Sequence, residues 1–153
     1  MEDAVRVTQI EIPGVLVFEP TVLSDHRGAF LEVYQGKLVM ALEGTVYDVV
    51  VDIRKGSPSF GRWYGVELSG DNLRQMYIPP GCAHGFCVTS ATASFLYKCT
   101  AYYSPECDRG ILWNDPALRI QWPISEPILS SKDQRLPTLS AMDSELPVYR
   151  SPA

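Results

Sequence analysis

Glycine and proline interrupt this chain so often that it has little room for long helices. The 153 residues contain 11 Gly and 12 Pro, and both residue types break helices and favour turns. The segments between these breakers are short and rich in Val, Ile, Tyr, Phe and Thr, which favours strands. We expect strands at 5–12, 15–18, 29–34, 37–42, 46–53, 60–68, 74–78, 84–88 and 93–100. Many short strands at close spacing predict one all-β domain spanning residues 1–153, an antiparallel sandwich or barrel.

The C-terminal third has a different pattern. Prolines recur here at Pro116, Pro123, Pro127, Pro137, Pro147 and Pro152. We expect this stretch to be irregular and to lie over the surface of the barrel. Residues 142–153 are predicted to form a flexible tail, because chain ends without apolar anchors are usually mobile.

Charge and hydropathy exclude several classes of partner. Asp and Glu number 18 against 13 Lys and Arg, which gives a net charge of -5. A protein that binds nucleic acid needs clustered positive charge, so we expect no nucleic-acid partner. We also expect no membrane partner, because no apolar run is long enough for a membrane span. Residues 1–6 lack the apolar core of a signal peptide, and we therefore predict a cytoplasmic protein.

Cysteine and histidine usage argues against a metal site. Cys82, Cys87, Cys99 and Cys107 have spacings that fit zinc poorly, and small buried thiols are the expected interpretation. The chain has 2 His, and no His-x-His pair occurs. A metal site in a β-barrel normally needs two or three imidazoles plus a carboxylate, so we predict none.

Four residues could carry chemistry, although each has an ordinary structural explanation when taken singly. His84 follows Pro79-Pro80-Gly81 and could be a half-buried histidine at a strand start. Tyr97 could be a core aromatic, Lys37 a solvated lysine at a strand end, and Asp133 a capping aspartate. Only their combination with neighbouring motifs is informative.

These motifs occur in an order that is specific to one family. They are Gln35-Gly36-Lys37-Leu38-Val39, Asp52-Ile53-Arg54-Lys55 with Ser57-Pro58-Ser59-Phe60-Gly61, Ile78-Pro79-Pro80-Gly81-Cys82-Ala83-His84-Gly85-Phe86, Phe95-Leu96-Tyr97-Lys98, Tyr102-Tyr103-Ser104-Pro105-Glu106 and Arg109-Gly110-Ile111-Leu112-Trp113-Asn114-Asp115-Pro116. From about residue 10 to about residue 139 the chain resembles the dTDP-4-dehydrorhamnose 3,5-epimerase family of deoxysugar synthesis. The resemblance implies a cupin-type antiparallel jelly-roll barrel.

The resemblance also implies a reaction and a set of roles. The family inverts C3 and C5 of a dTDP-linked 4-keto-6-deoxyhexose by deprotonation and reprotonation, without a cofactor. By resemblance Tyr97 is the acid that reprotonates carbon, Lys37 stabilises the enolate oxygen, and Asp133 orients the catalytic base. Substrate contacts are implied for His84, Arg27, Glu32, Arg54 and Tyr102, with the two arginines on the diphosphate and Tyr102 on the nucleotide.

One departure separates this chain from the family pattern. In the family, a few dozen residues carrying the base histidine lie between the early Asp-x-Arg-Gly motif, here at 25–28, and Gln-Gly-Lys. Here residues 31–34 run almost directly into Gln35-Gly36-Lys37, so the segment is absent and Val33 falls where the base should be. His26 is too early in the chain to match. We expect the barrel to lack about two strands, and an open or rearranged barrel to lean on a partner chain. The resemblance implies that this partner is a second copy of the chain, because the family forms dimers.

Several functions remain open on this basis. The first is an epimerase impaired by loss of its base, which typically costs a few powers of ten in rate. In the second, His84 or a water held by Asp133 serves as a surrogate base and one epimerisation survives. The third is a non-catalytic dTDP-sugar-binding or partner subunit, and the fourth is a shortened product without a function. A sugar 3,4-ketoisomerase is a weaker alternative, because it needs paired imidazoles that this chain does not easily supply.

Overall fold

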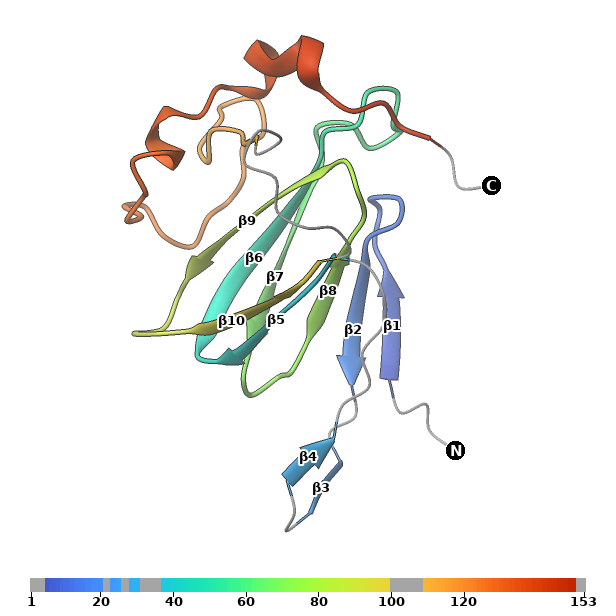
Figure 1. Cartoon of the computed structure of the whole chain (residues 1–153), viewed down its shortest axis with the longest axis vertical. Coiled ribbons are helices and arrows are strands. Elements are labelled where there is room, and N and C mark those ends of the chain that lie inside the picture. Colours follow the sequence, from blue (N-terminus) through green and yellow to red (C-terminus); the bar gives the residue numbers. More distant parts are fainter. Residues whose placement is uncertain (1–4, 21–22, 26–27, 31–36, 100–108, 151–153) are drawn as a thin grey trace.

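Two antiparallel sheets face each other and form the body of the molecule (Figure 1). The computed structural model describes residues 5–20, 23–25, 28–30, 37–99 and 109–150. The larger sheet has the strand order β1 (Val5–Gln9), β2 (Leu16–Pro20), β8 (Gln75–Ile78), β5 (Lys37–Glu43) and β10 (Ser94–Lys98). The smaller sheet has the order β7 (Trp63–Ser69), β6 (Thr45–Asp52) and β9 (Cys82–Val88). The expected all-β, antiparallel architecture is therefore confirmed.

One short strand and one turn differ from the sequence-based expectation. A hairpin of β3 (Leu23–Asp25) and β4 (Gly28–Phe30) lies apart from both sheets, and β3 was not expected (Figure 1). Residues 60–62 were predicted to open a strand, but they lie in a turn in which Phe60 N–H donates to the Ser57 carbonyl. Gly61 has φ +76°, a conformation that glycine adopts without strain. This turn delays the start of β7 to Trp63.

The core between the two sheets explains the alternation seen in the sequence. Val39 and Ala41 of β5 pack against Val46 and Val50 of β6 in one buried cluster, which also contains Ile12, Val15, Leu68, Met76 and Ile78. Successive side chains of a strand point to opposite faces. Alternate residues of β5 and β6 therefore point into the barrel, and this register determines which polar side chains reach its interior.

A second apolar cluster joins the C-terminal segment to the outer face of β6. Val49 and Val51 pack there against Leu118, Leu139, Met142 and Leu146. The segment contains two short 3-10 helices, η2 (Asp133–Arg135) and η3 (Leu139–Glu145), and is otherwise irregular through residue 150 (Figure 1). A largely irregular segment that lies over the barrel was the sequence-based expectation.

The predicted flexible tail from residue 142 rested on a lack of apolar anchors, and the structure supplies two. Met142 is 6% exposed and Leu146 is 7% exposed. Farther along, Lys55 N–H donates to the Pro147 carbonyl, and Tyr149 N–H donates to the Lys55 carbonyl. Residues 142–149 are therefore tied to the barrel by both apolar contacts and backbone hydrogen bonds.

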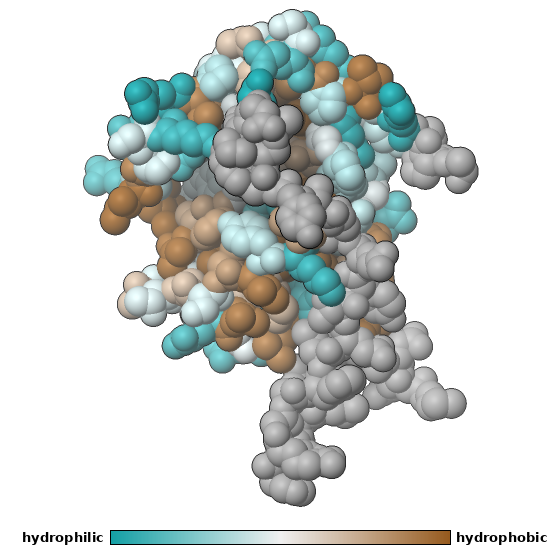
Figure 2. Space-filling model, viewed as in Figure 1, coloured by the Kyte–Doolittle hydropathy of each residue, from teal (hydrophilic) through white to brown (hydrophobic). Residues whose placement is uncertain are grey.

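Each sheet ends at a strand that pairs on one side only among the described residues. The larger sheet has its edges at β1 and β10, and the smaller sheet has its edges at β7 and β9. β9 and β10 carry Phe86, Val88, Leu96 and Tyr97, each between 38% and 44% exposed. Figure 2 shows hydrophobic atoms gathered over this side of the molecule. The barrel is thus apolar and exposed at the β9 and β10 edges.

None of the described helices has the length and apolar character that a membrane span requires. The cytoplasmic location stays a prediction.

Candidate functional site

Three residues singled out from the sequence point into the same end of the barrel. Tyr97 lies opposite Val39 in the β10–β5 pairing, and His84 lies opposite Val50 in the β6–β9 pairing. Directly opposed residues share a face of the sheet, and Val39 and Val50 are fully buried core residues. Lys37 precedes Val39 by two residues and therefore shares its face. Two sheets thus bring an ammonium, an imidazole and a phenol toward one interior.

A buried carboxylate that the sequence analysis did not single out completes this group. The Nε2 atom of His84 lies 2.9 Å from Oδ2 and 3.1 Å from Oδ1 of Asp48. Asp48 is fully buried, and the His84 side chain is 5% exposed. Asp48 alternates with Val46 and Val50 on the inward face of β6. A charged residue at an inward position of an apolar strand was the sequence signal that could have identified it.

The environment acts on the two acidic groups in the same direction. Burial raises the pKa of Asp48, against the hydrogen bond to His84 and the positive charge of Lys37. Burial, followed by the Asp48 charge, raises the pKa of Tyr97 to about 12. Tyr97 is therefore protonated at neutral pH and can act as an acid. Asp48 is thus close enough to both Lys37 and Tyr97 for their charges to interact.

Aromatic rings pack around this group at the open side of the barrel. The Phe86 and Phe95 rings are 4.5 Å apart, and the Phe95 and Tyr97 rings are 5.0 Å apart and nearly perpendicular. The His84 and Tyr97 rings are 6.0 Å apart with an interplanar angle of 78°. Because Tyr97 is 44% exposed, a small molecule could approach the group from this side.

Asp133 has its described contacts within its own turn. It opens η2, where Ser130 Oγ donates to its Oδ2 at 2.7 Å and its backbone N–H donates to Ser130 Oγ at 3.1 Å. Asp133 and Ser130 thus bond to each other within the turn, and η2 has no side-chain cap hydrogen bond at its N-terminus. The carboxylate that contacts His84 in the structure is that of Asp48.

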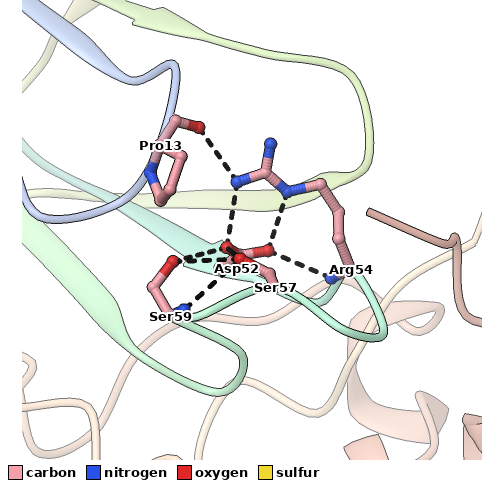
Figure 3. A network of polar contacts seen from close by, with 5 residues as sticks. All are labelled: Pro13, Asp52, Arg54, Ser57 and Ser59. Atoms are coloured by element: carbon pink, nitrogen blue, oxygen red, sulfur yellow. Dashed lines mark hydrogen bonds and ion pairs between the residues drawn. The ribbon is translucent and has the colours of Figure 1, made fainter. Parts of the chain in front are cut away.

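Arg54 belongs to a buried network at the other end of β6 (Figure 3). Its Nε and Nη2 donate to the two carboxylate oxygens of Asp52 at 2.8 and 2.9 Å, and Nη2 also donates to the Pro13 carbonyl. Ser57 and Ser59 donate to Oδ2 of Asp52 at 2.5 and 2.6 Å. Burial alone would raise the pKa of Asp52, but these hydrogen bonds outweigh it and lower the pKa to about 2. The guanidinium of Arg54 thus has a structural role, and the residue is 8% exposed.

Other predicted contacts fall outside the described residues. Arg27, Glu32 and Tyr102, expected to meet the diphosphate and nucleotide, are among them. The same holds for His26 and Val33.

Thiol and metal chemistry find little support among the described residues. Burial raises the pKa of Cys82 to about 11 and raises the pKa of Cys87, so both thiols are protonated at neutral pH. No group of three or more His, Cys, Asp or Glu residues in the described parts of the chain could hold a metal ion.

The fold and this group define a class of protein: a cupin-type β-barrel whose interior end carries ionisable side chains from both sheets. A family model described as dTDP-4-dehydrorhamnose 3,5-epimerase matches residues 34–141. The chain belongs to the dTDP-4-dehydrorhamnose 3,5-epimerase family.

Individual relatives agree with this assignment. The dTDP-4-dehydrorhamnose 3,5-epimerase of Shigella flexneri is 42% identical over 167 residues, covering 84% of this chain and 92% of the relative. The crystal structure of dTDP-6-deoxy-D-glucose-3,5-epimerase from Legionella pneumophila, in complex with dTDP-4-keto-L-rhamnose, matches with a TM-score of 0.90 and 39% identity. That match covers 96% of this chain and 100% of the other.

A third relative has a narrower activity. The 3'-monoepimerase ChmJ of Streptomyces bikiniensis, solved in complex with dTDP-quinovose, matches with a TM-score of 0.84 and 28% identity over 92% of each chain. The resemblance seen in the sequence motifs is therefore confirmed at the level of family and fold.

Proposed function

We propose that this chain inverts carbon centres next to the keto group of a dTDP-linked 4-keto-6-deoxyhexose, as a step of deoxysugar biosynthesis of the rhamnose type. The observation that carries the proposal is the approach of Lys37, His84 and Tyr97 to one interior end of the barrel. Hydrogens on C3 and C5 of such a sugar are acidic, since each carbon adjoins the ketone. Their exchange needs a base, an acid on the opposite face and a positive group near the enolate oxygen.

Tyr97 and Lys37 have properties that suit two of these roles. With a pKa raised to about 12, Tyr97 holds a proton that it can return to carbon. Lys37 carries its ammonium at the start of β5 and acts on the charge of Asp48. A cation at this place would stabilise negative charge that develops on the sugar oxygen. The reaction needs no cofactor.

We propose that the reaction is slower here than in relatives with a longer chain, because a segment that carries the family's base is missing. Two observations support a missing segment. The alignment with the Shigella flexneri enzyme spans 167 positions, more than the 153 residues of this whole chain, so the relative has residues that this chain lacks. The family model begins at residue 34, next to the place where the motifs run together.

The strands expected in that segment would belong at the open side of the barrel. β9 and β10 each have a single strand neighbour among the described residues, as do β1 and β7 at the opposite edges. About two missing strands would cover the β9 and β10 edges and the apolar side chains they expose. This is the proposed cause of the exposed surface over β9 and β10.

Substrate contacts by Arg27, Glu32 and Tyr102 remain part of the proposal, on the strength of their motifs alone. Arg54 is left out, because its guanidinium already binds Asp52 and Pro13. Asp133 is left as a second carboxylate whose partner in the family is missing here.

We further propose that the chain acts as a homodimer, because an open barrel exposes apolar surface and unpaired backbone groups. Size-exclusion chromatography with light scattering should give twice the chain mass. A stable monomer at micromolar concentration would refute the dimer without touching the proposed activity.

The experiment that tests the function is proton exchange in heavy water. The protein is incubated with dTDP-4-keto-6-deoxyglucose, and NMR follows the signals of H3 and H5. We expect deuterium to enter at least one of these positions, and we expect Tyr97→Phe to alter the exchange. Tyr77→Phe is the matched control, since Tyr77 lies opposite Leu38 on the other face of the same sheet.

Two negative results would lead to different conclusions. Exchange that stays at the rate of buffer, together with calorimetric binding of dTDP, would replace the enzyme by a dTDP-sugar-binding module. Absence of both exchange and binding would leave neither function.

A further inference from the structure

We propose that His84, held by Asp48, is the general base that removes the proton next to the sugar ketone in this chain. The inference rests on the proposed function and adds to it the group that takes up the proton. It also assigns a role to Asp48, which no sequence motif had singled out.

The contacts of His84 determine which ring nitrogen is available. Nε2 lies 2.9 Å from Oδ2 of Asp48, and an ionised carboxylate only accepts hydrogen bonds. Nε2 therefore carries the hydrogen, and the lone pair of the neutral imidazole is on Nδ1. Among the described residues no buried side-chain nitrogen or oxygen lacks a partner. No described residue bonds to Nδ1 either, so this atom keeps some contact with solvent and is available to accept a proton.

The buried carboxylate of Asp48 favours proton uptake by His84. Asp48 is 0% exposed, so its carboxylate is removed from water. This loss of solvation disfavours the negative charge and raises the pKa of Asp48. A proton that arrives on Nδ1 creates an imidazolium next to this carboxylate. The two opposite charges attract strongly at such a distance in a buried environment. Asp48 thus acts as a positioning residue that fixes the tautomer of His84 and stabilises its charged form.

The acid needed on the other side of the reacting carbon lies next to the pair. The Tyr97 ring centre is 6.0 Å from that of His84, and the two rings are nearly perpendicular at 78°. They project from β10 and β9, which belong to different sheets. Rings this close leave no room for a sugar between their centres, so the sugar would bind beside them, against the Nδ1 edge of the imidazole and the hydroxyl of the phenol.

The step needs no co-reactant other than water, with which His84 and Tyr97 exchange their protons. The carbon–hydrogen bond breaks, its electron pair forms the enolate, and the proton goes to Nδ1 of His84. Tyr97 then gives its hydroxyl proton to the opposite face of the carbon, and the ketone is restored. His84 is left as imidazolium and Tyr97 as phenolate. Tyr97 is 44% exposed, so it regains a proton from solvent while His84 releases one.

The test measures deuterium uptake at H3 and H5 by the full-length chain and its variants. We expect His84→Asn to slow exchange by about 10² to 10⁴-fold, the usual contribution of a general base. Asp48→Asn should slow it by at least about tenfold and change its pH profile, because the charge that stabilises the imidazolium is lost. His26→Asn, which removes the other histidine, and Asp71→Asn, which changes an exposed turn residue, should exchange at the wild-type rate.

A second measurement determines the tautomer of His84 and its dependence on Asp48, without relying on activity. Nitrogen-15 NMR of the imidazole should show the tautomer with hydrogen on Nε2 in the wild type, and a mixed population in Asp48→Asn. Calorimetry with dTDP and circular dichroism should give the same affinity and the same β-sheet spectrum for each variant. A loss of exchange then reports chemistry rather than folding or binding.

The outcomes separate the two proposals. Wild-type exchange that persists in His84→Asn, or that is lost in His26→Asn, would overturn the role of His84 and leave the proposed function standing. A wild-type tautomer with hydrogen on Nδ1 would overturn the role of His84 as base. Wild-type exchange at the buffer rate would overturn the proposed function itself, and the base with it.

Discussion

Two aspartates four residues apart on β6 are equally buried but differ in their partners. Both Asp48 and Asp52 are 0% exposed. Asp52 accepts hydrogen bonds from Arg54, Ser57 and Ser59. Asp48 is bound by the imidazole of His84. The pKa of Asp52 is lowered to about 2, whereas burial raises the pKa of Asp48.

The difference indicates which end of the strand holds structure together and which end is prepared for chemistry. A carboxylate whose oxygens are fully bound stays ionised and fixes the loops around it. A buried carboxylate with fewer partners remains sensitive to protons and substrates, a property common at functional sites. The Asp52 end also binds the C-terminal segment, because the Arg54 guanidinium lies 5.0 Å from the centre of the Tyr149 ring.

The largest expected effect on stability is that of Asp52→Ala. Removing this carboxylate leaves the Arg54 charge buried without its partner, which typically destabilises a protein by about 3 to 5 kcal/mol. Urea unfolding monitored by tryptophan fluorescence would measure the loss. Asp71→Ala, at an exposed turn, is the control and should change stability by less than about 0.5 kcal/mol. A loss at Asp52 no larger than that of the control would contradict a structural role for the network.

The two aspartates should also differ in how stability depends on pH. The pKa of Asp52 falls from an ordinary 3.8 to about 2 on folding, so its contribution is present above the ordinary value. That contribution, about 2 kcal/mol, should be lost as the pH falls from about 4 through about 2. The free energy of unfolding of wild type and Asp52→Asn, compared across this range, should converge toward low pH. Parallel pH curves would show that Asp52 is not the responsible group.

Local features of the fold were predicted from the sequence, whereas features that depend on distant residues were missed. Strand positions followed from alternating apolar residues and turn chemistry, as in β5 and β6, because these patterns are local. The turn at 60–62 was missed, because the hydrogen bond from Gly61 N–H to the Asp52 carbonyl joins residues nine apart. Met142 and Leu146 were missed as anchors, because their apolar partners lie on a distant strand.

The candidate site was predicted in its residue types and only partly in its geometry. The motifs led to Lys37, His84 and Tyr97, which the strand register turns toward one interior. Asp48 lies in a strand that looks purely structural, and its importance follows from one non-local contact with His84. Arg54 was predicted to contact the diphosphate, but it binds the carboxylate of Asp52 two residues away. Motif resemblance does not reveal this contact.

A smaller effect is expected when the Asp52 network loses one hydroxyl. Ser59→Ala removes a 2.6 Å hydrogen bond to the carboxylate and should destabilise the fold by about 1.5 to 2 kcal/mol, as is usual for bonds to charged groups. Ser90→Ala is a matched control, because Ser90 is exposed and its hydroxyl bonds to uncharged backbone groups, accepting from the Thr45 N–H and donating to the Thr92 carbonyl. Equal effects of the two variants in thermal unfolding would mean that Asp52 does not depend on the Ser59 hydroxyl.

The smallest effect on stability, and the most informative, should come from Asp48→Asn. The folded state raises the pKa of Asp48, so keeping this group charged at neutral pH opposes folding. The neutral amide removes that penalty, and we expect a change within about 1 kcal/mol of wild type, toward higher stability. As the pH falls through the raised pKa toward the ordinary one, wild type should gain stability relative to the variant, a trend opposite to that of Asp52. Chemical unfolding at several pH values measures both features. A loss of 3 kcal/mol or more, typical of a broken buried pair, would place Asp48 with Asp52 among the structural carboxylates and remove the contrast between the two ends of β6.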